Sequence, residues 1–170
     1  MKTRLLLSLL FLIILQEACN FNSAPKCTDA KVKNLVMDIT IEELKNQYLQ
    51  RPENAMISLM AMSTSNTYQQ IILEGSMAQG GGNYKPSYKD LKKHEKDDKT
   101  IYAIVHNVDS IFADNSDITL ESIRVDDVDK GIKKCNCSAD IVSGENKVPI
   151  SYSAQYTEEG KLYVTVSGLN

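Results

Sequence analysis

The apolar residues of this chain change their spacing once, near Asp117, and this change limits the fold more than any other feature of the sequence. Over residues 101–112, apolar residues recur every three or four positions, which places them on one face of a helix. Over residues 132–142, apolar and polar residues alternate, which places the apolar ones on one face of a strand. The sequence therefore predicts an α+β fold in which helices precede a sheet.

The region before residue 101 is predicted to be mostly helical. A first helix is expected over residues 28–51, and a second capping box at residues 40–43 predicts a kink or a restart inside it. Residues 53–75 match the helical pattern only in part. Residues 75–99 combine three successive glycines, a proline and a run of charges, so they predict a mobile surface loop with a short helix from Ser87.

Four strands joined by short turns are predicted after residue 117, and such strands form an antiparallel meander. They are expected at residues 118–125, 132–142, 148–156 and 161–169. In the first strand, either the Ile118–Leu120 pair or the Ile123–Val125 pair faces inward, depending on a bulge. One face of this sheet needs a cover, and the preceding helices are the only cover available.

The first 18 residues match an export signal. Lys2 and Arg4 form a positive start, and an apolar run over residues 5–15 follows them. That run is shorter than the roughly 20 residues that a membrane-spanning helix needs. We therefore expect residues 1–18 to be a signal peptide and the protein to be exported to the bacterial cell envelope.

Cys19 stands where a lipoprotein signal would end. Ala18 fits that pattern, whereas Glu17 and Gln16 do not, and Gln16 is also a poor match to ordinary signal peptidase. We expect Cys19 to carry a lipid that anchors the protein to the membrane. Ordinary cleavage near Ala18, giving a soluble periplasmic or secreted protein, is the alternative.

After Cys19, residues 19–26 are expected to form a tether, and residues 27–170 a single domain. If Cys19 carries lipid, three cysteines remain and allow one disulfide with one spare thiol; otherwise four cysteines allow three pairings. Export favours a disulfide, with buried free thiols as the alternative. Cys135 and Cys137 lie two apart on one strand with parallel Cβ directions, which is poor geometry for a bond between them.

Short motifs resemble those of a group of small exported bacterial proteins, most of them uncharacterised. The motifs are CTD at 27–29, CSAD at 137–140, VPISY at 148–152 and YVxVxGL at 163–169. The resemblance implies a disulfide between Cys27 and Cys137 that pins the first helix to the second strand, leaving Cys135 as the spare thiol. The helix-on-sheet order is also similar to the cystatin-like and nuclear-transport-factor-2-like arrangements.

The sequence shows little that indicates catalysis. His94 lies in a charged segment, and His106 stands beside an apolar helical face without a nucleophile motif. The glycines at 80–82 lack the Gly-Lys-Ser/Thr of a phosphate loop, and the C-x-C spacing at 135–137 is too short for a usual zinc pair. We expect no catalytic residue, metal or cofactor, and the net charge of −3 argues against nucleic acid as a partner.

A surface for a protein partner is predicted in the loop. The chain has eight Tyr, three Phe and no Trp, and Tyr is favoured at binding surfaces. Tyr84 and Tyr88 lie beside Lys85 and Lys89, so these four residues are the candidates; a merely solvated loop is the competing interpretation.

These observations favour a non-enzymatic lipoprotein of the cell envelope that acts as a protein-binding accessory or as an inhibitor of the immunity type. The first alternative is a module that binds a small molecule between the helices and the sheet. A hydrolase that uses His106 is the second. The oligomeric state is not predicted.

Overall fold

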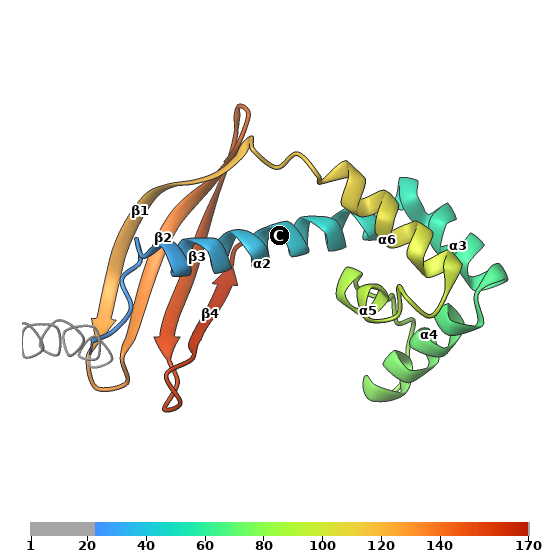
Figure 1. The fold of residues 1–170 in the computed structure, drawn as a ribbon, viewed down its shortest axis with the longest axis horizontal. Helices are drawn as coiled ribbons and strands as arrows, with labels where there is room; N and C mark the ends of the chain where they lie inside the picture. Colours follow the sequence, from blue (N-terminus) through green and yellow to red (C-terminus); the bar gives the residue numbers. More distant parts are fainter. Residues whose placement is uncertain (1–22, 170) are drawn as a thin grey trace, which may run out of the picture.

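The computed structural model describes residues 23–169, so the predicted signal peptide, Cys19 and the first half of the predicted tether lie outside the described residues. The helices are α2 (Ala30–Gln50), the 3₁₀ turn η2 (Pro52–Asn54), α3 (Ala55–Thr64), α4 (Asn66–Ala78), α5 (Tyr88–Lys93) and α6 (Lys99–Ile111). The strands are β1 (Ile118–Asp129), β2 (Lys134–Ser143), β3 (Asn146–Tyr156) and β4 (Leu162–Ser167). Helices precede a four-stranded sheet, which confirms the α+β class (Figure 1).

The sheet is an antiparallel meander in the order β1-β2-β3-β4, as predicted. Strand β2 shows the alternation most clearly, since every second residue from Cys135 to Ile141 is buried. Strand β1 runs four residues beyond the predicted end at Val125, and Asp129 then closes the turn to β2. Its carboxylate accepts hydrogen bonds from the backbone amides of Gly131 and Ile132.

In β1 the Ile118–Leu120 pair faces the core, which was one of the two predicted alternatives, and a bulge splits the Ile123–Val125 pair. Ser122 adopts a positive φ of 52°, and the pairing with β2 shifts between Glu121 and Arg124. The extra residue brings Leu120 and Ile123 onto the core side together, whereas Val125 is left 58 % exposed.

Helix α2 is one continuous helix of 21 residues, so the predicted restart near residue 40 is wrong. Thr40 is buried, and its hydroxyl donates to the carbonyl oxygen of Val36 at 2.8 Å, one turn earlier in the same helix. The hydroxyl therefore finds its partner inside the helix and does not cap a new one.

Two hydrophobic cores lie along α2, which is about 30 Å long at 1.5 Å per residue. The first half of α2 covers one face of the sheet, and Figure 1 shows the second half extending away to join α3–α6. The sheet-side core contains Cys27, Val32, Val36, Cys135, Cys137, Ala139, Ile141, Ile150, Tyr152, Ala154 and Val164. The helix-side core contains Ala61, Tyr68, Ile71, Tyr88, Leu91, Ile101, Ile104, Val105 and Val108. Thus α2 alone supplies the helical residues of the sheet-side core, and the other helices pack with one another.

Candidate functional site

The predicted loop at 75–99 contains more regular structure than expected. Helix α4 extends to Ala78, and α5 begins at Tyr88 after Ser87, as the short-helix prediction proposed. Ser87 and Asp90 form a reciprocal capping box. Tyr88 is only 7 % exposed and donates a hydrogen bond from its hydroxyl to Asp109 at 2.5 Å. Tyr88 therefore belongs to the helix-side core.

Tyr84 fastens the segment between α4 and α5. Its ring packs so closely on α4 that a Cβ built on Gly75 would lie 2.2 Å from it. Its hydroxyl donates to Asp90, and this hydrogen bond together with partial burial raises the pKa of Tyr84 to about 12. Of the four predicted partner-binding residues, Lys85 and Lys89 are the two that the structure leaves exposed.

Helix α3 carries the most conspicuous exposed apolar surface of the described chain. It contains no charged residue, and Ala61 is its one buried side chain among residues 23–169. We call its exposed residues the α3 surface: Met56 (65 % exposed), Leu59 (60 %), Met60 (63 %) and Met62 (45 %). Contiguous apolar surface of this kind marks interaction sites, and Met-rich surfaces adapt to partners of varied shape.

An apolar groove of about 550 Å³, here called the α3–α4 groove, runs along one side of α3. Its lining residues are Leu49, Gln50, Arg51, Pro52, Ala55, Ser58, Leu59, Met62, Tyr68, Ile72, Gly82, Asn83, Tyr84, Lys85 and Pro86. Two of the predicted partner-binding residues, Tyr84 and Lys85, thus lie at this groove. Arg51 and Lys85 are its charged lining residues, and within residues 23–169 no carboxylate lines it.

A second apolar groove, of about 450 Å³, lies on the other side of α3, against α6. Its lining residues are Ile57, Met60, Ala61, Thr64, Lys99, Thr100, Ala103, Ile104, Asn107 and Val108. Lys99 is the charged residue of this set. Helix α3 therefore forms an apolar ridge between two apolar grooves.

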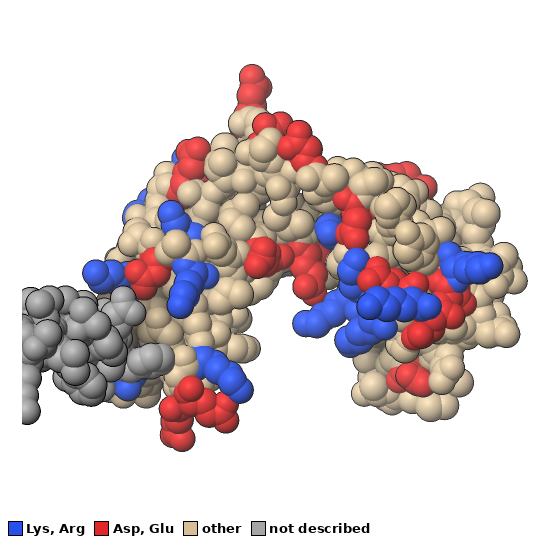
Figure 2. All heavy atoms as spheres, in the orientation of Figure 1, with Lys and Arg blue, Asp and Glu red and all other residues tan. Residues whose placement is uncertain are grey.

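An ion-pair network holds α5 against α2 and α6. Lys45 of α2 and Lys92 of α5 place their Nζ atoms 2.6 and 3.0 Å from the carboxylate oxygens of Asp109 on α6. Burial works against the charged form of Asp109, but hydrogen bonds from Lys45, Tyr88 and Lys92 outweigh it and lower its pKa to about 2. Figure 2 shows the lysines and carboxylates gathered over α5. The network positions the segment that carries Tyr84 and Lys85.

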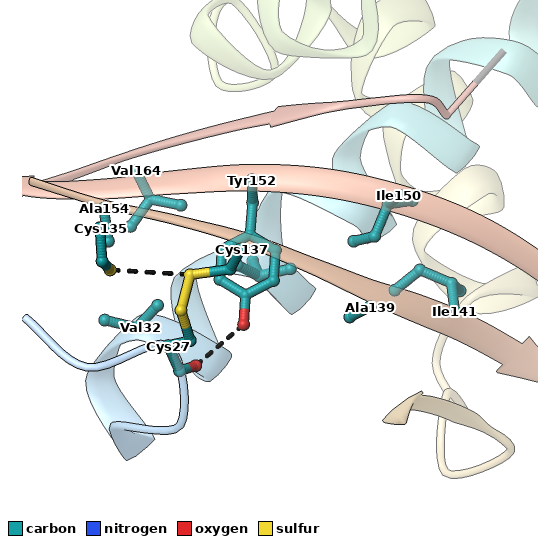
Figure 3. Packing of buried hydrophobic residues seen from close by; sticks show 11 residues of the cluster. Cys27, Val32, Cys135, Cys137, Ala139, Ile141, Ile150, Tyr152, Ala154 and Val164 are labelled. Carbon is teal, nitrogen blue, oxygen red and sulfur yellow. Dashed lines mark hydrogen bonds between the residues drawn. A yellow bond between two sulfur atoms is a disulfide. The ribbon is translucent and has the colours of Figure 1, made fainter. Parts of the chain in front are cut away.

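The sheet-side core holds the cysteines. Cys27 and Cys137 form a disulfide with Cα atoms 6.0 Å apart, which confirms the pairing that the resemblance implied (Figure 3). The hydroxyl of Tyr152 donates to the Cys27 carbonyl oxygen at 2.9 Å. Cys135 is a buried free thiol, and burial raises its pKa. The three sulfur atoms lie within 4.8 Å of one another, but two of them are bonded together and are not thiolate ligands.

Neither histidine lines the α3–α4 groove or the groove against α6. His106 is exposed on α6, where its ring stacks on Tyr102 with centroids 5.7 Å apart. His94 follows α5 and places Nδ1 3.8 Å from a carboxylate oxygen of Asp97. Between α2 and the sheet, the side chains of the sheet-side core pack together, but a cavity of about 500 Å³ remains beside the second half of α2. It is lined by Ile39, Glu42, Glu43 and Asn46 of α2, by the predicted partner-binding residue Lys89, and by residues 166–169. This is where the alternative prediction would hold a small molecule.

Comparisons with protein-family models, curated proteins and solved structures find no match to this chain. None of the helices within residues 23–169 is both long enough and apolar enough to cross a bilayer.

The α3 surface was not predicted from the sequence. The run AMISLMAM at 55–62 has no polar face, so its periodicity does not tell which side of the helix is buried. Its composition was the available signal, because an apolar helix without charge must be covered by something. In residues 23–169 that cover is incomplete.

Proposed function

We propose that this protein is a non-enzymatic, protein-binding module of the bacterial cell envelope, an accessory protein or an inhibitor of the immunity type. The observation that carries the proposal is the α3 surface, four large apolar side chains exposed together on a helix without charge. Exposing them to water costs free energy that contact with a partner would recover.

The two ends of the molecule support a division of roles. The first described residue, Ser23, lies beside Tyr156 and Leu162 at the sheet, and α3 lies at the far end of α2 (Figure 1). A lipid on Cys19 would hold the sheet end near the membrane. The α3 surface would then point away from the bilayer, where it could meet a protein partner.

Crosslinking in the envelope of the bacterium that encodes the chain tests the proposal. The full-length protein is expressed there with a photoreactive residue at Met56, and crosslinked species are identified by mass. We expect a discrete protein adduct that is lost in Leu59→Lys and Met60→Lys. Val125→Lys is the matched control, because Val125 is 58 % exposed, close to the 60 % of Leu59 and the 63 % of Met60, but lies on β1.

Loss of the adduct in the α3 variants, with retention in the control, would support the proposal. An adduct that is unaffected by both α3 variants, or no protein adduct at all, would overturn it. Intact-mass analysis of the membrane fraction tests the anchor separately. We expect a chain that begins at Cys19 with a diacylglyceryl or triacylated mass, and an unmodified chain would remove the lipid from the proposal.

A further inference from the structure

Resting on the proposed protein-binding function, we infer that the α3–α4 groove receives the apolar face of an acidic amphipathic helix from the partner. Three properties of the groove support this occupant: its apolar walls, the positive charge of its charged residues, and the secondary structure of the residues that line it.

The walls of the groove are built from large apolar side chains on three helices. Leu59 and Met62 project from α3, Tyr68 and Ile72 from α4, and Leu49 from the end of α2. A volume of about 550 Å³ accommodates several apolar side chains of a ligand. Successive turns of a helix present such side chains at spacings of three, four and seven residues.

The charged residues of the groove are cations, although the chain as a whole has a net charge of −3. Arg51 has a carboxylate contact with Glu53 at 3.9 Å, with both side chains more than 60 % exposed, so the pair holds the guanidinium weakly. Lys85 has no ion pair with any residue from 23 to 169. A partner with carboxylates beside its apolar stripe would complement both groups.

Nine of the fifteen lining residues belong to helices, whose amide and carbonyl groups largely bond to each other. The other six are Arg51 and the segment 82–86, which is not a strand. An extended peptide laid in the groove would lack a strand edge to pair with and would desolvate its own backbone without replacement bonds. A helix satisfies its backbone internally. The groove therefore favours a helical partner over an extended one.

A second copy of this chain is a poorer occupant. In a two-fold symmetric contact the same groove would face itself, which brings Arg51 and Lys85 toward the same cations of the other copy. The like charges would oppose that contact. A bilayer is also disfavoured if the sheet end carries the anchor, because α3 lies at the opposite end of α2 (Figure 1).

The test uses three fluorescent helical peptides with one apolar stripe and with Glu, Gln or Lys at the flanking positions. Their affinities for the oxidised chain from residue 19 onward are measured by anisotropy. We expect the order Glu, Gln, Lys, with the Glu peptide binding about tenfold more tightly than the Lys peptide. The double variant Arg51→Glu/Lys85→Glu should reverse this order, and Leu59→Lys should abolish binding of all three.

Lys99→Glu is the matched control, because Lys99 borders the groove on the other side of α3 and its reversal should leave the order unchanged. Equal affinities, a preference for the Lys peptide, or no peptide binding would overturn the inference. The outcome that favours an anionic lipid is that the protein instead sediments with phosphatidylglycerol vesicles in a way that depends on Arg51 and Lys85, and shows no preference among the peptides. That result would also overturn the inference. In each case the crosslinking result with Leu59→Lys decides the proposed function separately.

Discussion

The Sγ atom of Cys135 lies 3.6 Å from Sγ of Cys137, which is already bonded to Cys27. Both strand cysteines therefore lie close to Cys27, and Cys137 is the one that forms the disulfide with it (Figure 3). The bond closes a sequence separation of 110 residues and joins the start of α2 to the middle of β2. This disulfide, together with the hydrogen bond from Tyr152 to Cys27, ties the sheet-side core to the N-terminal end of the described chain.

Reduction of the Cys27–Cys137 disulfide should destabilise the protein strongly. Cross-links that close long loops restrict the unfolded chain, and removing a native one costs about 2–5 kcal/mol. Urea unfolding of oxidised and reduced protein, both carrying Cys19→Ser and Cys135→Ala to prevent alternative pairing, measures the difference. Equal unfolding free energies in the two states would contradict the prediction.

Cys135 should react with a thiol reagent only after the protein opens. Its side chain is buried, and burial raises the pKa of the thiol, so little thiolate is present at neutral pH. In a protein that carries Cys19→Ser, so that Cys135 is the one thiol outside the disulfide, we expect slow labelling by Ellman's reagent in native buffer and one fast equivalent in urea. Rapid stoichiometric labelling of the native protein would show that this part of the sheet-side core opens readily.

The sheet could be predicted in detail because its signal is local. Alternation along β2 and β3 determines which residues face inward, and the short turns determine the strand order. The division into two cores could not be predicted, because α2 is partly buried along its whole length and its apolar stripe does not show where one core ends. The packing of Tyr84 on α4 could not be predicted either. The sequence around Tyr84 indicates a loop and the sequence around Gly75 indicates a helix, and neither indicates that the two residues are in contact.

Asp109→Asn should lower the stability most at neutral pH and least in acid. Its three hydrogen-bonding partners hold the pKa at about 2, below the ordinary value of 3.8. A lowered pKa stabilises the folded state above the unfolded value, and that contribution is lost as pH falls from about 4 toward 2. We expect a loss of about 1–2 kcal/mol at pH 7, discounted for partial exposure of the carboxylate.

Urea unfolding of the wild type and Asp109→Asn at pH 7, 4, 3 and 2 checks this. The difference between the two proteins should shrink below pH 4. Asp90, whose pKa is also about 2, contributes to the acid response of both proteins and cancels in the difference. A difference that is constant with pH would show that the aspartate charge is not the stabilising group.

The effect of Gly75→Ala on the free energy of unfolding should have opposite signs in the wild type and in Tyr84→Ala. Alanine favours an exposed helix interior over glycine by about 0.8–1 kcal/mol, so on its own the change would stabilise α4. The added Cβ would lie 2.2 Å from the Tyr84 ring, and displacing that ring should cost about 1–3 kcal/mol. We therefore expect Gly75→Ala to destabilise the wild type but to stabilise Tyr84→Ala, as measured by urea unfolding of all four proteins. If Gly75→Ala stabilised both backgrounds equally, the ring of Tyr84 would not pack on α4, and Tyr84 would not line the α3–α4 groove as described.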